Sequence, residues 1–368
     1  MMIDFAGIKK DYLTHQKKIH FAIQRVLDSA CFIMGDEVKK LEENLKNYVG
    51  SKYALTCSNG TSALILSLMA LGIQKDDEII TSSFSFFASA EAIAILGAKP
   101  IFVDINPKTF LIDETKIKQA ITKKTKAILV VSLFGNIPNM EKINSIAKEF
   151  GLFVLEDGAQ SFGAMYQGKK SGNLCDISTT SFFPAKPLGC FGDGGAIFFN
   201  DENLYEKIYA LRSHGQIKRY THEFLGINAR LDSLQAAILN VKLSYFSEIL
   251  QKRQENAQKY QEKLKDYPEI FLQEITKDCK SNYAQFSILS KNRDSLITYL
   301  KTKQIPTAIH YPIPIPKQKA FSYLNVEKKY FSQAQKITQE IFSLPLHAYL
   351  SDEEITYITQ CIKEFKGI

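Results

Sequence analysis

Between about residues 50 and 200, short apolar runs alternate with longer amphipathic segments. The apolar runs are KYALTC (52–57), EIITSS (78–83), KPIFVDI (99–105), KAILVVSL (126–133), LFVLED (152–157) and AIFFND (196–201). Continuous apolar strands separated by segments of helix length are typical of a mainly parallel sheet covered on both faces. The pattern therefore predicts an α/β core, with a ligand site beyond the carboxyl ends of the strands.

After about residue 235 the chain changes character. Long charged helices such as QKRQENAQKYQEKLKDY (251–267) give way to short strand-like pieces, the proline-rich HYPIPIPKQ (310–318) and a last amphipathic helix. We predict a large domain over residues 1–240, including the N-terminal segment, and a smaller C-terminal domain over residues 241–368.

Charge, cysteine usage and hydropathy exclude several classes of protein. The 46 Lys+Arg and 39 Asp+Glu give a formal charge of +7, but the two signs are mixed along helix-like stretches, which argues against a nucleic-acid partner. Six cysteines without CxxC pairing argue against a zinc or other metal site and fit a reducing cytosol. No stretch approaches the roughly 18 apolar residues of a membrane span, so we expect no membrane partner and a cytoplasmic protein.

Two segments that follow the first strands have open interpretations. SNGTSAL (58–64) places Gly60 and Thr61 where a helix begins, which favours an anion site or an ordinary N-cap. In FSFFASAEA (84–92), Phe86 and Phe87 are either core residues or an aromatic face for a planar ligand. The local sequence does not decide between these alternatives.

A carboxylate and a lysine stand at later strand ends. Asp157 ends a strand that should be buried, so it needs a cationic partner, unless it caps a helix with Gln160 at the capping-box position. Lys186 lies between Pro184 and Pro187 and is either a solvated loop lysine or an amine whose lowered pKa lets it attack a carbonyl. Anion site, aromatic ring, acid and lysine together are the set that pyridoxal phosphate requires.

These segments also carry a resemblance to a known family. IMGDEVKKLEENL, SNGTSAL, IFVDI, LEDGAQSFGA, TSFFPAKPLGCFGDGGA, LRSHGQ, INARLDSLQAAIL and HYPIPIPKQ are similar to the DegT-type nucleotide-sugar aminotransferases across essentially the whole chain. The resemblance implies the fold of aspartate aminotransferase, a type I fold for pyridoxal 5'-phosphate, with the cofactor in the large domain and a homodimer with shared active sites.

The resemblance implies a role for each candidate residue. Lys186 would bind the cofactor aldehyde and move the proton during transfer, while Asp157 would hold the pyridinium nitrogen. The other implied cofactor contacts are Gln160 to the ring hydroxyl, Phe86 to the ring face, Gly60, Thr61 and Ser181 to the phosphate, and Asn228 to the phosphate of the neighbouring subunit. Arg230 would meet a carboxylate, and His310 and Tyr311 would line the nucleotide-sugar pocket, although a surface arginine and a packed loop histidine are alternatives.

The implied reaction is transamination, because Lys186 is present where some members of the family have lost the lysine. L-Glutamate would convert the cofactor to pyridoxamine 5'-phosphate, which would aminate a nucleotide-linked keto sugar for glycan biosynthesis. The lysine segment resembles enzymes that act at C3 of UDP-linked 2-acetamido-3-keto sugars or their uronic acids. Phe224 stands where a uronate enzyme carries arginine, which weakens the case for a C6 carboxylate. A dTDP-3-keto-6-deoxyhexose, amination at C4, decarboxylation of an amino acid, and a regulator without catalysis are the alternatives.

Overall fold

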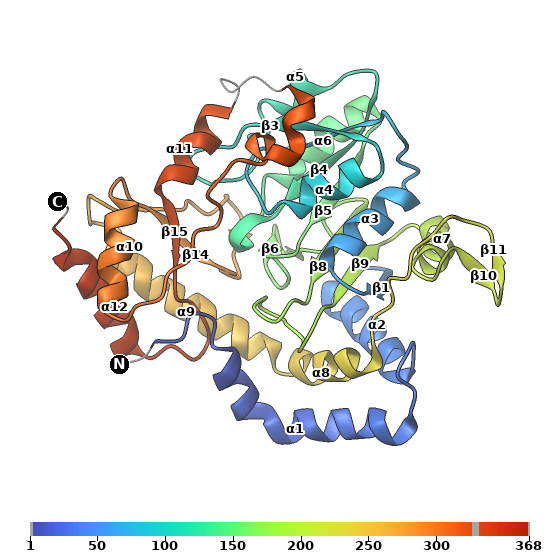
Figure 1. Ribbon diagram of the computed structural model, residues 1–368, viewed down its shortest axis with the longest axis horizontal. Helices are drawn as coiled ribbons and strands as arrows, with labels where there is room; N and C mark the ends of the chain where they lie inside the picture. Colours follow the sequence, from blue (N-terminus) through green and yellow to red (C-terminus); the bar gives the residue numbers. More distant parts are fainter. Residues whose placement is uncertain (1–2, 326–330, 367–368) are drawn as a thin grey trace.

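The computed structural model describes residues 3–325 and 331–366 and is built around a seven-stranded sheet (Figure 1). Its strands, in spatial order, are β1 (Tyr53–Cys57), β9 (Gly195–Phe199), β8 (Ile177–Ser181), β5 (Phe153–Asp157), β4 (Thr125–Val131), β2 (Glu78–Ser82) and β3 (Lys99–Val103). All neighbouring pairs are parallel except the two that β9 forms with β1 and β8. The predicted α/β core with a mainly parallel sheet is confirmed.

Helices enclose this sheet because its apolar runs need cover on both faces. They include α3 (Gly60–Ala70), α4 (Ala88–Ile95), α6 (Met140–Phe150) and α7 (Glu202–Leu211). Two separate clusters of buried side chains contact the sheet residues, one containing Leu129 and Leu155 and the other containing Ile128 and Val154. Adjacent residues of one strand therefore enter cores on opposite faces, as the two-residue period of a strand requires.

A smaller unit follows the long helix α9 (Phe246–Leu264). It contains an antiparallel sheet of β12 (Phe271–Leu272), β14 (Phe286–Leu289) and β15 (Ile341–Leu344), with α10 (Arg293–Thr302), α11 (Ser332–Glu340) and α12 (Asp352–Glu364). Helix α9 contributes to two cores: Phe246 and Leu250 pack with the large unit, and Tyr260 and Leu264 pack with the small one. The domain boundary near residue 240 stays a prediction, since α9 begins there and bridges both units.

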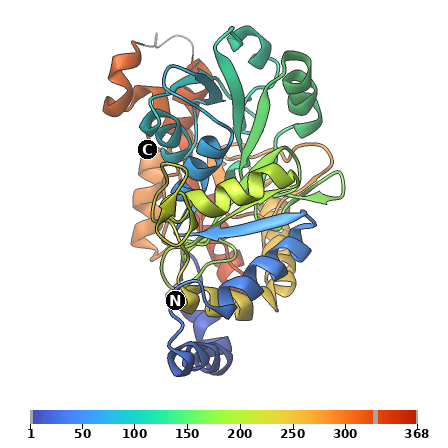
Figure 2. The same ribbon diagram turned by 90° about the vertical axis from the view of Figure 1, so that its right-hand side faces the viewer.

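The N-terminal helix α1 (Ile8–Ser29) runs beside α8 (Ser233–Leu243), next to α2 (Asp36–Val49) (Figure 1). The hairpin of β10 (Gln216–Lys218) and β11 (Thr221–His222) extends from the right of Figure 1 and faces the viewer in Figure 2. Within residues 3–325 and 331–366, no helix combines the length and apolarity that crossing a membrane would need.

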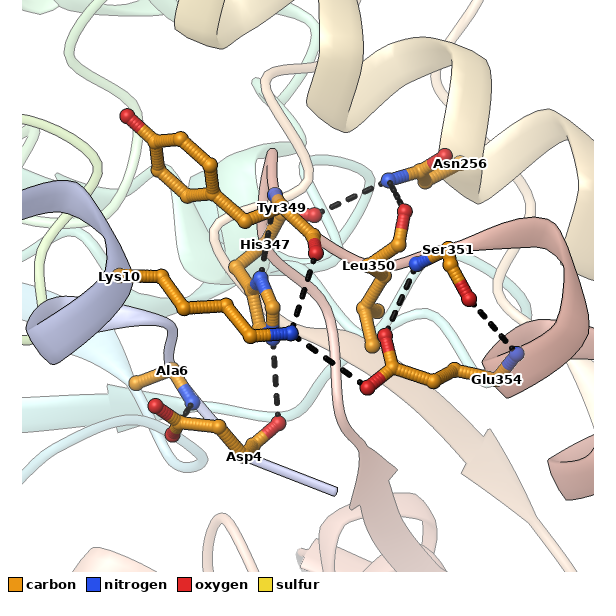
Figure 3. A network of polar contacts seen from close by, with 9 residues as sticks. All are labelled: Asp4, Ala6, Lys10, Asn256, His347, Tyr349, Leu350, Ser351 and Glu354. Atoms are coloured by element: carbon orange, nitrogen blue, oxygen red, sulfur yellow. Dashed lines mark hydrogen bonds and ion pairs between the residues drawn. The ribbon is translucent and has the colours of Figure 1, made fainter. Parts of the chain in front are cut away.

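The segment before α1 is attached to the small unit by polar contacts (Figure 3). The backbone oxygen of Asp4 lies 3.2 Å from Nε2 of His347, and Lys10 Nζ lies 3.4 Å from Glu354 Oε1. Glu354 also forms a capping box with Ser351 at the start of α12. Asp4 and Lys10 therefore lie against the C-terminal unit, and α1 continues from there along α8 at the bottom of Figure 1.

Candidate active site

A cavity of about 680 Å³ lies at the carboxyl ends of the sheet strands and extends to the small unit. All but two of the candidate residues from the sequence line it: Gly60, Thr61, Phe86, Asp157, Gln160, Ser181, Lys186, His310 and Tyr311. This is the position that the strand-end rule predicts for an α/β sheet. Asn228 and Arg230 are not among the lining residues.

The turn between β1 and α3 is built for a close approach of backbone groups. Asn59 caps α3, accepting a hydrogen bond at Oδ1 from Ser62 N at 2.8 Å. A Cβ atom on Gly60 would lie 2.8 Å from Cβ of Ser181, so glycine is needed for the start of α3 to approach the end of β8. Capping falls to Asn59, which leaves Gly60 and Thr61 at a helix N-terminus that opens into the cavity.

Phe86 lines the cavity and is 55% exposed, whereas Phe87 packs against the large core. The core interpretation therefore holds for Phe87 and is wrong for Phe86. The Phe86 ring lies 5.8 Å from the Tyr311 ring at a tilted angle of 46°. These two aromatic side chains form one apolar wall that can accept a planar group.

Asp157 and Glu156, neighbours on β5, have separate tasks. Glu156 accepts hydrogen bonds from Ser132 Oγ and Ser171 Oγ, both at 2.8 Å, and does not line the cavity. Asp157 lines the cavity and accepts from Ala159 N at 3.1 Å. The chain after Asp157 forms a turn and no helix, so the capping-box alternative is wrong.

Burial and charge couple Asp157 to Lys186. Burial raises the pKa of the Asp157 carboxyl, against the opposing effects of the Ala159 N–H and of Lys186. Burial lowers the pKa of the Lys186 amine, and Asp157 opposes that shift. An amine with a lowered pKa keeps more of its neutral, nucleophilic form, which a solvated loop lysine would not do.

The loop that carries Lys186 is closed by its own backbone. Lys186 N donates to Phe183 O at 2.8 Å, and Cys190 N donates to Phe182 O at 2.8 Å. A Cβ atom on Gly189 would lie 2.5 Å from the Pro184 oxygen, so the turn needs glycine. The prolines and this glycine hold the lysine at the cavity.

Gln160 and Tyr311 connect the two units across the cavity. Gln160 accepts at Oε1 from Phe134 N at 2.7 Å, which orients the amide so that Nε2 donates to Tyr311 Oη at 2.9 Å. His310 lies beside this pair, with Nδ1 2.9 Å from Ser343 Oγ. Burial, with a smaller contribution from Lys186, lowers the pKa of His310 to about 4 and keeps the ring neutral near pH 7.

Asn228 and Arg230 lie outside this cavity. Asn228 is exposed, and Arg230 is half-buried with its Nε atom covered and without a hydrogen-bond partner in the part of the chain that the structure describes. The six cysteines are free thiols. Among residues 3–325 and 331–366, no cluster of His, Cys, Asp and Glu side chains could hold a metal ion.

The cavity also contains polar residues that the sequence did not single out: Ser85, Asp193 and Gln285. Ser85 and Asp193 belong to segments already chosen for Phe86 and Lys186, so their position in those segments was a usable signal. Gln285 comes from the small unit, just before β14, and no local motif marks it.

The cavity residues fit pyridoxal 5'-phosphate. The helix N-terminus at Gly60 suits a phosphate, Phe86 offers an aromatic face, and the buried carboxylate of Asp157 suits a protonated ring nitrogen. Lys186 supplies the amine for an aldehyde. These features define a site of the pyridoxal-phosphate type on an α/β fold.

Residues 14–363 match the DegT/DnrJ/EryC1/StrS aminotransferase family, and the chain belongs to it. It is 46% identical over 361 residues to the UDP-2-acetamido-2-deoxy-3-oxo-D-glucuronate aminotransferase of Pseudomonas aeruginosa, covering 97% of this chain and 98% of that protein. It is 42% identical to the dTDP-3-amino-3,6-dideoxy-alpha-D-galactopyranose transaminase of Aneurinibacillus thermoaerophilus and 40% identical to a pleiotropic regulatory protein of Geobacillus stearothermophilus, with 99% of each chain covered in both comparisons.

Solved structures show the same fold. The crystal structure of S. venezuelae DesV in complex with a ketimine intermediate superposes with a TM-score of 0.97 at 32% identity, covering 99% of this chain and 98% of that one. NtdA from Bacillus subtilis with bound cofactor PMP gives a TM-score of 0.90 at 31% identity, covering 98% of this chain and 84% of that one. The predicted type I fold, the family and its pyridoxal phosphate cofactor are confirmed.

Proposed function

We propose that this chain transfers the amino group of L-glutamate to C3 of a UDP-linked 2-acetamido-3-keto hexose or its uronic acid. The observation that carries the proposal is that the half-buried Lys186, with its lowered amine pKa, and the buried Asp157 line one cavity that reaches both units. Similarity to an aminotransferase of a 3-oxo glucuronate sugar supports the choice of C3 and of UDP.

Lys186, Asp157 and Gln160 then have defined roles at the cofactor. Pyridoxal phosphate, when bound, supplies an aldehyde that takes up an amino group and a ring that withdraws electrons. Lys186 holds the aldehyde and moves a proton at Nζ, since its lowered pKa favours the neutral amine. Asp157 would keep a proton on the ring nitrogen, and Gln160, whose Nε2 donates to Tyr311, would use its second Nε2 hydrogen for the ring hydroxyl.

We also propose a homodimer with shared active sites. Asn228 is exposed and does not line the cavity of its own chain, which leaves it available to a second copy. Large exposed apolar side chains gather on α1 and the segment after it: Leu13, Phe21, Leu27, Phe32 and Ile33. Several large apolar side chains exposed on neighbouring segments support an interface between subunits. Arg230, beside Asn228, would meet a carboxylate at the completed site.

The C6 group of the sugar separates two versions of the proposal. Phe224 packs against the large core of its own chain and does not line the cavity. Its side chain is uncharged and could not pair with a C6 carboxylate. Lys186 is the lone lysine or arginine among the cavity-lining residues that the structure describes. The cavity residues of one chain therefore favour a sugar with a neutral C6 group. A dTDP-3-keto-6-deoxyhexose is the next candidate, and the similarity to a dTDP-sugar transaminase supports it.

The test is a panel of UDP- and dTDP-linked 3-keto sugars, each generated in place by a partner dehydrogenase or ketoisomerase and read by product mass. We expect L-glutamate-dependent amination of a UDP-linked 3-keto sugar. Amination of a 4-keto sugar alone would refute the proposed position, and conversion of an amino acid with loss of carbon dioxide would refute transamination.

A regulator without catalysis is the second candidate, favoured by the similarity to a pleiotropic regulatory protein. Lys186→Ala separates the two functions, because the aminotransferase must lose turnover while a regulator keeps its partner binding. We place the activity in the cytoplasm, where six free thiols are stable.

A further inference from the structure

Gln285 carries an unused hydrogen-bond acceptor beside the cavity. Its side chain lines the cavity, and its Oε1 atom is buried without a hydrogen-bond partner in the part of the chain that the structure describes. A buried amide oxygen without a partner is destabilising, because it has lost its hydrogen bonds to water. Such an oxygen at a binding cavity is satisfied when a ligand brings a donor to it.

The turn that carries Gln285 is held in place from several sides. Arg253, buried in α9, donates from one guanidinium nitrogen to Tyr283 O at 2.7 Å and to Ala284 O at 2.9 Å. Asn282, fully buried, accepts from Ala284 N at 3.0 Å and donates to Phe162 O at 2.9 Å. The residue before Gln285 is thus fixed to both units.

The turn also packs closely against the large unit. A Cβ atom on Gly135 would lie 1.9 Å from the side-chain Oδ1 of Asn282 and 2.9 Å from the backbone N of Tyr283, so only glycine lets the two segments approach this closely. On the other side of Gln285, Phe286 begins β14 and is buried in the small unit's core. The backbone that carries Gln285 is therefore preorganised, which lowers the entropy cost of placing its side chain against a ligand.

The chemistry of the acceptor selects its partner. Phosphate oxygens and the carboxylates of L-glutamate are acceptors at neutral pH and do not pair with an amide oxygen. The groups that match the cofactor come from the large unit, at Gly60, Asp157 and Lys186. The ammonium of L-glutamate is a donor, but it is the group that is exchanged on the cofactor held by Lys186. The remaining donors belong to the nucleotide-linked keto sugar, whose ring hydroxyls and acetamido N–H are the donors on the reacting sugar.

We propose that Gln285 is a specificity-determining residue that binds the sugar of the nucleotide-linked substrate, accepting at Oε1 a hydrogen bond from a hydroxyl or acetamido N–H of the sugar. This role rests on the proposed function, since it assigns the substrate of that reaction. It assigns sugar recognition to the small unit and leaves cofactor chemistry to the large one.

The experiment measures the two half-reactions of the loaded enzyme separately. Gln285→Leu keeps the approximate volume and removes the acceptor, and Gln258→Leu, at an exposed position on α9, is the matched control. For Gln285→Leu we expect an unchanged glutamate half-reaction, followed by cofactor absorbance, and a kcat/KM for the keto sugar that falls by about tenfold or more. Gln258→Leu should leave both half-reactions unchanged.

Several results would overturn the assignment. An unchanged sugar half-reaction, or an equal loss in both half-reactions, would mean that Gln285 does not read the sugar. Gln285→Glu keeps an acceptor oxygen at the same length and should retain more sugar turnover than Gln285→Leu. A sugar with a hydroxyl in place of the acetamido group identifies the donor: the penalty disappears if the donor is the N–H and persists if it is a ring hydroxyl.

Calorimetric binding of UDP-N-acetylglucosamine separates this inference from the proposed function. If the wild type aminates no sugar but binds this nucleotide sugar, and Gln285→Leu weakens the binding, Gln285 retains its role while the reaction is wrong. If the wild type aminates sugars and Gln285→Leu behaves like the wild type, the role of Gln285 is wrong while the reaction stands. A wild type that neither binds nor aminates any sugar of the panel overturns both.

Discussion

Gly195→Ala tests whether the turn before α3 is the phosphate site. Gly195 begins β9 and pairs with Cys57 of β1. A Cβ atom on Gly195 would lie 2.5 Å from the Asn59 oxygen, 2.6 Å from the Asn59 carbonyl carbon and 3.0 Å from Gly60 N. All three atoms are backbone, so no flexible side chain can move aside.

The size of the effect follows from these distances. Restoring a tolerable contact of about 3 Å requires the turn to move by roughly 0.5 Å, a displacement that costs about 1–3 kcal/mol in a packed region. The same displacement moves Gly60 N, which belongs to the helix N-terminus at the cavity. We expect the Kd for pyridoxal phosphate to rise about tenfold, since 1.4 kcal/mol corresponds to one factor of ten.

The assay is titration of the cofactor-free protein with pyridoxal phosphate, followed by absorbance, together with thermal unfolding. Gly72→Ala is the control, because Gly72 has φ +77° and no atom within 4 Å of an added Cβ. Both variants should lose stability, but only Gly195→Ala should bind the cofactor more weakly. A Gly195→Ala protein with the wild-type Kd would refute the placement of the phosphate at this turn.

Three further outcomes are expected. Asp157→Asn should lower the rate of the glutamate half-reaction by about a hundredfold or more in single-turnover measurements, because the neutral amide no longer stabilises charge on the ring; a wild-type rate would remove Asp157 from the mechanism. Lys186→Ala and Asn228→Ala should each be inactive alone, yet a mixture refolded together should regain activity, since one site of a mixed dimer then has both native residues; no recovery would mean that Asn228 does not complete the partner's site. Burial lowers the pKa of His347 to about 4, below its ordinary 6.5, so on acidification this histidine is protonated in the unfolded chain before it is protonated in the folded one. The free energy of unfolding in denaturant titrations should therefore be constant above pH 6.5 and decrease toward pH 4. His347→Gln should flatten this decrease.

The sequence predicted the site where local pattern and position along a strand were sufficient. Asp157 and Lys186 follow apolar runs whose carboxyl ends meet at one sheet edge, so their proximity could be inferred without coordinates. The different surroundings of Glu156 and Asp157 follow from the alternation of a strand. The sequence could not show which of Phe86 and Phe87 would be exposed, because that depends on packing against the small unit's side chains.

Other features depend on contacts between distant segments. Helix α5 is limited to Ile117–Ala120, since Ile121 is extended and Thr122 N donates a hydrogen bond to Thr125 Oγ1, where β4 begins. Gln285 enters the cavity because Arg253 and Asn282 fix its turn, and no short-range pattern encodes that contact. Tertiary contacts therefore decided the parts of the site that the motifs left open.

The central claim is that Lys186 is the lysine that holds pyridoxal phosphate in this cavity. Its most direct test is borohydride reduction of the loaded protein, followed by proteolysis and mass spectrometry of the peptides. The structure predicts a phosphopyridoxyl group on the peptide that contains Lys186 and no such group after Lys186→Ala. Modification of a different lysine, or a wild-type protein that retains no phosphopyridoxyl group after reduction, would contradict the account.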